Sequence, residues 1–152
     1  MDTNTYPRQG FAGILIAPGF DEEAVVPCLC QMRQSGTAVI LAGVPAGLVT
    51  GVSGLTVRPD CPLAQLPIHD CRLLVIPGKR ACAAHLLSDP RVHQAVEATF
   101  ANGGLVAAMS PVVEQVLLGV GLLTEATYDQ FIAQGNQKTN WFVQALIARI
   151  VV

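Results

Sequence analysis

Apolar residues come in short blocks along the chain, and most of these blocks end at proline or glycine. Phe11–Ala17 is a continuous apolar run before Pro18-Gly19, and Cys71–Ile76 is interrupted only by Arg72 before Pro77-Gly78. Gly104–Met109 is a third such run, and it is followed at once by Ser110-Pro111. Short apolar runs of this kind are typical of strands that are buried on both faces of a sheet. The second strand along the chain is predicted at Thr37–Ala42.

Helical patterns fill most of the segments between these strands. Asp21-Glu22-Glu23 opens the first helix with acidic residues in its first turn, and Gly36 stops it after about Gln34. Pro90 suits the first position of a helix that Ser88 or Asp89 would cap. The predicted helices cover about 21–34, 81–87, 91–101, 111–121 and 139–151.

Two shorter features complete the pattern. Leu48–Thr50 and Leu55–Val57 flank Gly51–Gly54, which predicts a small β-hairpin. A last short strand is predicted within Ala126–Ala133. Strands that alternate with helices predict an α/β fold, in which a mostly parallel central sheet carries helices on both faces. Ligands bind such sheets beyond the carboxyl ends of the strands, so we expect 18–23, 77–80 and 110–111 to converge on one crevice.

The composition fits one domain with a large core. About half of the 152 residues are hydrophobic and 13% are charged, as expected for a sheet covered on both faces or for a subunit of an oligomer. Residues 11–152 are predicted to form this domain, and the polar residues 1–10 are predicted to be a disordered leader.

Charge, hydropathy and cysteine usage exclude several classes of protein. The net charge is −2 and the basic residues are scattered, so we expect no nucleic-acid partner. No apolar run approaches the roughly 18 residues of a membrane span. The five cysteines are odd in number and irregularly spaced, which indicates a reducing cytoplasm. Cys28-Leu-Cys30 lacks a second cluster, so no metal site is expected, and no cofactor either.

Ser110 is the main candidate for chemistry. A buried strand that breaks into a helix at one small nucleophilic residue is the arrangement called a nucleophile elbow. The partial positive charge of the helix N-terminus favours an anion there. The alternative interpretation, which we favour, is a small residue whose hydroxyl caps the following helix.

Several blocks, in the same order, resemble the ThiJ/PfpI superfamily of the class I glutamine amidotransferase-like group. Pro18–Pro27 is similar to the family's Pro-Gly-Phe-Glu-Glu segment, and Val49–Asp60 to its hairpin and following Pro-Asp. Leu73–Gly78 resembles the strand that ends in Pro-Gly-Gly, and Gly104–Ser110 resembles Gly-x-x-x-Ala-Ile-Cys. Ile132, Thr139 and Trp141 match the final strand and the Thr-x-Phe helix start.

The resemblance covers roughly residues 11–151 and implies a flavodoxin-like three-layer sandwich and a homodimer. It also implies glyoxalase, deglycase or chaperone-like roles, with amidases and isonitrile hydratases among the relatives. Family members use an elbow cysteine, a glutamate from the first helix that shares its proton, and often a histidine. Backbone N–H groups near the Pro-Gly-Gly turn and the elbow form an oxyanion hole.

The chain departs from this pattern at each catalytic part. Ser110 replaces the cysteine, and a serine hydroxyl needs a positioned base. Pro111 has no N–H to donate to an oxyanion, and Lys79 replaces a glycine. The histidine segment is shortened, so that Tyr128 or Asp129 falls near its position.

Two functional hypotheses follow. The leading one is a catalytically weak or inactive member that binds a small molecule or a protein partner. The alternative is a hydrolase, glyoxalase or deglycase-type enzyme for small carbonyl or amide compounds, with Ser110 as nucleophile or hydrogen-bond donor and Glu23 as general base. Glu22 could take the place of Glu23 if the one-residue gap lies differently. The residues assigned to ligand binding are Glu22, Gly78, Lys79, Pro111 and Tyr128.

The remaining titratable residues carry weaker hypotheses. Cys82 could be a substitute thiol or a redox sensor, although a cysteine in such a position is more often packed and inert. His85 could act as a base, although an ordinary helix residue is the favoured interpretation. Lys79-Arg80 could attract an anion, and His69 and His93 are interpreted as surface residues.

Overall fold

The computed structural model describes residues 10–150 and has a three-layer α/β architecture. A six-stranded sheet has the order β5-β2-β1-β6-β7-β8, and each neighbouring pair in it is parallel. A separate antiparallel pair, β3 with β4, is the predicted hairpin. The strands are β1 (Phe11–Ile16), β2 (Val39–Gly43), β3 (Val49–Thr50), β4 (Thr56–Val57), β5 (Cys61–Pro62), β6 (Cys71–Ile76), β7 (Leu105–Ala108) and β8 (Phe131–Ala133).

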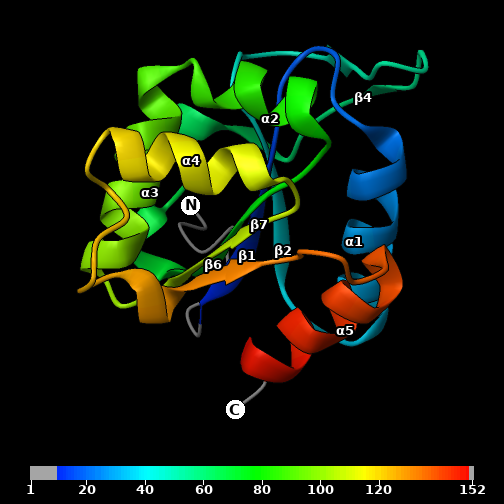
Figure 1. Ribbon diagram of the computed structural model, residues 1–152. Helices are drawn as coiled ribbons and strands as arrows, with labels where there is room; N and C mark the ends of the chain where they lie inside the picture. Colours follow the sequence, from blue (N-terminus) through cyan, green and yellow to red (C-terminus); the bar gives the residue numbers. More distant parts are fainter. Residues whose placement is uncertain (1–9, 151–152) are drawn as a thin grey trace, which may run out of the picture.

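Helices cover both faces of the sheet (Figure 1). Helices α1 and α5 lie on one face, and α2, α3 and α4 lie on the other. Short 3-10 helices occupy 63–65, 68–70 and 128–130. The α-helices are α1 (Glu22–Gln34), α2 (Arg80–Leu87), α3 (Pro90–Ala101), α4 (Pro111–Gly119) and α5 (Thr139–Ile150). The flavodoxin-like three-layer sandwich expected from the sequence is confirmed.

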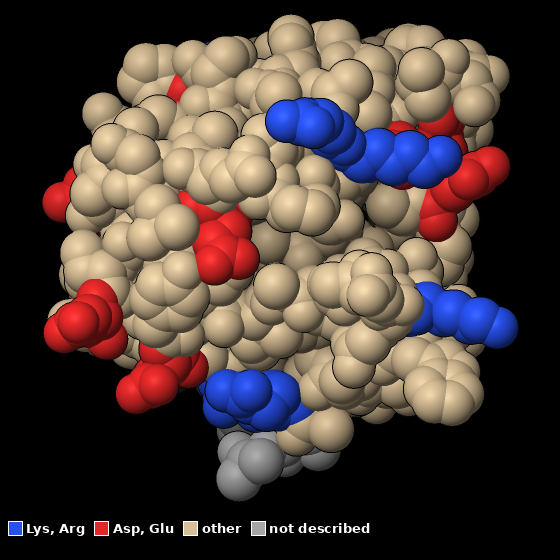
Figure 2. All heavy atoms as spheres, viewed as in Figure 1, with Lys and Arg blue, Asp and Glu red and all other residues tan. Residues whose placement is uncertain are grey.

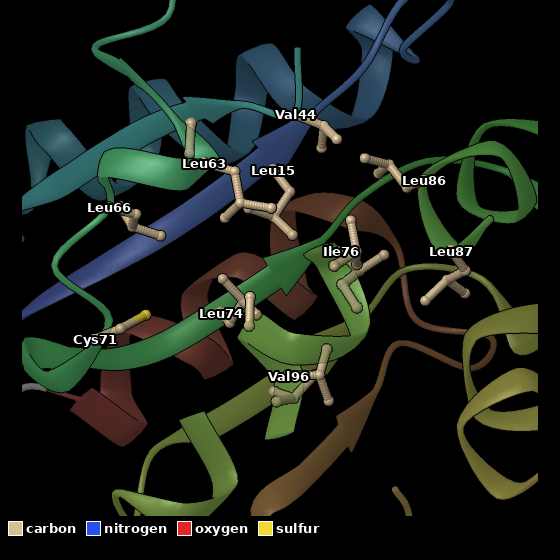
Figure 3. Close-up of a cluster of buried hydrophobic side chains, with 14 of the residues drawn as sticks. Leu15, Val44, Leu63, Leu66, Cys71, Leu74, Ile76, Leu86, Leu87 and Val96 are labelled. Carbon is tan, nitrogen blue, oxygen red and sulfur yellow. The ribbon is translucent and has the colours of Figure 1, made fainter. Parts of the chain in front are cut away.

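The core consists of two apolar layers, one on each face of the sheet. Successive residues of β1 alternate between them: Leu15 packs in the layer under α2–α4, and Ile14 and Ile16 pack in the layer under α1 and α5. All three side chains are fully buried. Figure 3 shows the first layer, in which Leu15 and Leu74 lie between side chains from the helices and loops above the sheet. Truncating such a leucine to alanine typically costs about 2–5 kcal/mol, so this layer holds the strand ends in place.

Several predicted boundaries needed correction. The strand expected within Ala126–Ala133 contains only three residues, β8, because Gln130 is held in a 3-10 turn where its side-chain amide donates to the carbonyls of Phe100 and Gly104. The strand expected at Thr37–Ala42 begins at Val39 and ends at Gly43. The two-residue β5 was not predicted, because an isolated Cys-Pro pair has no period that marks a strand. The predicted leader 1–10 lies outside the described residues except for Gly10, and Val151 of the last predicted helix lies outside them too.

Candidate functional site

Three strand ends meet at one edge of the sheet. Strands β1, β6 and β7 are adjacent and parallel, so Pro18, Pro77 and Ser110 follow them at the same edge. The chain runs from β1 outwards to β2 and later returns to β6 on the other side of β1. The junction of β1 and β6 is therefore the switch point at which doubly wound sheets bind ligands. The amide N–H of Met109 donates to the carbonyl of Ile76 at 3.1 Å, which ties the end of β7 to the end of β6.

Ser110 caps helix α4. Its hydroxyl accepts a hydrogen bond from the amide of Val112 at 3.4 Å, and Pro111 occupies the first helical position. The side chain is buried, and the backbone is extended, with φ −142° and ψ 142°. Within residues 10–150, every residue with positive φ is a glycine. Ser110 thus lies at the predicted strand-to-helix junction, but without the strained backbone that defines a nucleophile elbow.

The two candidate glutamates point to different partners. The Glu22 carboxylate accepts hydrogen bonds from the amides of Ser53, at 2.8 and 3.1 Å, and Leu55, at 3.2 Å. The Glu23 side chain is 87% exposed, and its Oε2 lies 4.0 Å from Nζ of Lys79. Glu22 therefore fastens α1 to the hairpin, and Glu23 forms a loose ion pair with Lys79.

The environment of Glu22 keeps it ionised. Loss of solvation raises its pKa, but backbone hydrogen bonds from Glu22, Leu55 and Ser53, with a further one from the Ser53 hydroxyl, lower that pKa by more. Gly51 permits this arrangement, because a Cβ there would collide with the Glu22 carboxylate. An ionised carboxylate whose oxygens accept backbone hydrogen bonds anchors the hairpin and is a poor proton acceptor for the Ser110 region.

The loops that follow β1 and β6 contact each other through Cys82. Its thiol donates to the carbonyl of Gly19 at 3.1 Å. Gly78, with φ +101°, lies against it: an added Cβ would come within 2.8 Å of the Cys82 Cβ and 3.6 Å of the Asp21 Cβ. Asp21 is 7% exposed and caps α1 by accepting from the amide of Glu23 at 3.1 Å. Sequence reasoning did not assign Asp21 to the site, although an aspartate before a helix start is an N-cap signal.

Cys82 has the properties of a packed thiol. Partial burial raises its pKa, the negative charge of Asp21 raises it further, and the hydrogen bond from Lys79 offsets only part of this. Reactive cysteines have lowered pKa values and are present as thiolates. The surroundings of Cys82 therefore favour structural packing over nucleophilic or redox chemistry.

Tyr128 lies away from this edge. It precedes β8, whose first residue pairs with Val106 near the start of β7, so Tyr128 is at the amino edge of the sheet. Its hydroxyl donates to the Glu114 carboxylate at 2.6 Å, and its ring packs edge-on against Phe131. That hydrogen bond raises the pKa of Tyr128. The loop after β8 reaches the end of β7, where the amide of Gln134 donates to the carbonyl of Ala108 at 2.9 Å.

The structure thus brings Gly78, Lys79 and Glu23 together and places Ser110 and Pro111 at the same edge. The backbone of Tyr128 lies at the amino end of β8, and its hydroxyl reaches the first turn of α4 at Glu114. Figure 2 shows one stretch of adjoining basic side chains at the top of this view, next to acidic ones, and other basic side chains apart from it. Within the described part of the chain, no three His, Cys, Asp or Glu side chains lie close enough to hold a metal ion. The helices of residues 10–150 are all too short or too polar to cross a bilayer.

Comparison with known proteins agrees with this architecture. Two curated relatives, deglycases of Thermococcus kodakarensis and Pyrococcus abyssi, are 29% and 28% identical over 110 residues, or 72% of this chain. The match spans 65% of the length of each relative. The structure of oxidised DJ-1 from Toxoplasma gondii superimposes with a TM-score of 0.78 at 19% identity, covering 93% of this chain and 91% of that one.

The Toxoplasma gondii structure shows that the fold is shared. A family model shows that the sequence is related as well. The profile of the DJ-1/PfpI family matches residues 12–141, which include the ends of β1, β6 and β7 and the start of α5. The chain belongs to the DJ-1/PfpI family.

Proposed function

We propose that this protein is a DJ-1/PfpI member that acts by binding a small molecule or a protein partner and has lost the covalent catalysis of its family. The observation that carries this proposal is the geometry of Ser110. Its backbone is unstrained and its hydroxyl is used as the cap of α4.

The groups that would activate Ser110 are engaged elsewhere. A serine nucleophile needs a base within hydrogen-bond reach and donors for the oxyanion. Glu22 is bonded to the hairpin, and Glu23 extends into solvent beside Lys79. Pro111 supplies no N–H at the start of the helix. The fold is retained, but the groups that a serine nucleophile needs are not directed at Ser110. This combination supports a binding role.

A second candidate is an enzyme of the deglycase, glyoxalase or hydrolase type that acts on small carbonyl or amide compounds through Ser110 and Glu23. It is favoured by one observation, namely that both curated relatives are deglycases. In this mechanism Glu23 would leave Lys79 and take the proton of the Ser110 hydroxyl.

Methylglyoxal turnover tests the two candidates. Purified protein is incubated with methylglyoxal, and both aldehyde loss and lactate formation are followed for wild type, Ser110→Ala and Glu23→Gln. The Thermococcus kodakarensis deglycase serves as the positive control. We expect wild type and both variants to match the buffer rate. Turnover by wild type that disappears in Ser110→Ala would overturn the binding proposal and establish the enzymatic one.

We further propose that the protein is a cytoplasmic homodimer. Cys28, Cys30, Cys71 and Cys82 are free thiols, which is consistent with a reducing compartment. The hairpin presents apolar side chains to solvent: Leu48, Val52 and Leu55 are 62%, 68% and 46% exposed. A second copy that covers them would bury this apolar surface. Sedimentation velocity should give a dimer for wild type and a monomer for Val52→Asp, whereas a monomeric wild type would refute the dimer.

A further inference from the structure

A cavity opens at the carboxyl ends of β1 and β2. Its volume is about 520 Å³, which falls within the range of small-molecule sites. The last turn of α2 and the start of α3 close its other side.

Most of the wall is apolar. Val44 and Leu86 form the inner part and are 4% and 2% exposed. Figure 3 shows their side chains next to each other at the end of the buried layer. Pro18, Pro45 and Pro90 contribute apolar rings, and the fixed φ angle of proline restricts the backbone at these three positions. An apolar wall suits the apolar body of a small ligand.

The carboxylate and the guanidinium in the wall pair with each other, and the imidazole in the wall takes no part in that pair. Arg91 donates to both carboxylate oxygens of Asp89, from Nε at 3.1 Å and from Nη2 at 2.7 Å. The Ser88 hydroxyl donates to the backbone carbonyl of His85 at 2.6 Å and leaves the imidazole untouched. Within residues 10–150, the His85 ring makes no hydrogen bond to the protein, and it is exposed at the cavity.

We propose that this cavity binds a small monocarboxylate with an apolar body, whose carboxylate contacts the His85 imidazole. The inference rests on the proposed binding function and names its site and ligand class. An imidazole is neutral or positive and never negative, and the one acid of the wall is already paired with Arg91. An anionic end group is therefore accepted, whereas a cation meets no uncompensated negative charge.

Benzoate is the probe, and the histidine side chains are the reporters. The chain has three histidines, so their imidazole resonances can be followed individually by NMR. His93 is bonded to the carbonyl of Leu87 at 2.7 Å, and His69 lies by a different cavity at the amino edge of the sheet. The titration is run with benzoate, benzyl alcohol and benzylamine on wild type, on His85→Gln, and on His69→Gln as the matched control.

We expect benzoate to shift the His85 resonances saturably and to leave those of His69 unchanged. His85→Gln should weaken binding about tenfold, as for the loss of one charge-assisted hydrogen bond, whereas His69→Gln should bind like wild type. Both variants change exposed residues, and matching melting temperatures would show that both are folded.

Three results would overturn the inference: no saturable shift with benzoate, equal affinity in His85→Gln, or binding of benzylamine as tight as that of benzoate. These failures are separate from a failure of the proposed function. A protein that binds no benzoate and turns over no methylglyoxal loses only this site and ligand class. A protein that turns over methylglyoxal through Ser110 loses the proposed binding function, whatever benzoate does.

Discussion

Replacing Ser110 with alanine separates its structural role from a chemical one. The substitution removes the hydroxyl that accepts from the amide of Val112 and so deprives α4 of its N-cap. Loss of a serine cap typically costs about 0.5–2 kcal/mol of unfolding free energy. The hydrogen bond here is long, 3.4 Å, so we expect the lower half of that range.

The expected loss is therefore about 0.5–1 kcal/mol, which corresponds to a fall of roughly 1–4 °C in melting temperature for a domain of this size. Urea unfolding followed by far-UV circular dichroism measures it as a lower midpoint at an unchanged m-value. Ser110→Gly should lose only a few tenths of a kcal/mol relative to serine, because glycine is accepted at N-cap positions. Gln115→Ala, an exposed substitution on the same helix, is the matched control and should stay within about 0.5 kcal/mol of wild type.

Two results would refute this reasoning. Unchanged stability of Ser110→Ala would mean that the hydroxyl does not cap α4. A loss of several kcal/mol would mean that the hydroxyl belongs to a larger buried network than its single bond to Val112.

Three further predictions concern other parts of the molecule. Iodoacetamide at pH 7.5 should alkylate Cys82 more slowly than the exposed Cys30, because burial and Asp21 raise the pKa of Cys82. Mass spectrometry of the labelled peptides measures both rates. Faster labelling of Cys82 would contradict its interpretation as an unreactive thiol. Gly119→Ala should stabilise the protein by about 0.5 kcal/mol in urea unfolding, since no atom lies within 4 Å of the added Cβ, and destabilisation would mean that the end of α4 is strained. Hydrogen bonds from Arg91 lower the pKa of Asp89 below its ordinary 3.8, so this carboxylate stabilises the fold above that value and the gain is lost as the pH falls through the lowered pKa. Asp89→Asn should flatten the acid limb of stability as the pH falls through the lowered pKa of Asp89, and an unchanged limb would refute the linkage.

Local pattern determined much of the fold in advance. The apolar run Cys71–Ile76 coincides with β6, and the acidic start at residues 21–23 marks the beginning of α1. For α3 the sequence predicts an N-cap at Ser88 or Asp89 and a proline at the first position, and the structure has Asp89 and Pro90 there. These features depend on neighbouring residues alone, through side-chain alternation, capping hydrogen bonds and the fixed φ of proline. The three strand ends followed from parallel topology, which places all carboxyl ends at one edge.

Only the tertiary structure decided which of these residues meet. Adjacent Glu22 and Glu23 are indistinguishable in sequence, yet one binds the hairpin 31 residues away and the other faces Lys79. The family resemblance put Tyr128 or Asp129 near the position of the histidine, but the register of β8 puts the backbone of Tyr128 at the amino end of that strand, and its hydroxyl bonds to Glu114 of α4. The cavity at His85 requires loops from β1 and β2 to meet the end of α2. Such pairings depend on strand register and on the path of loops through space, and no local period in the sequence encodes either.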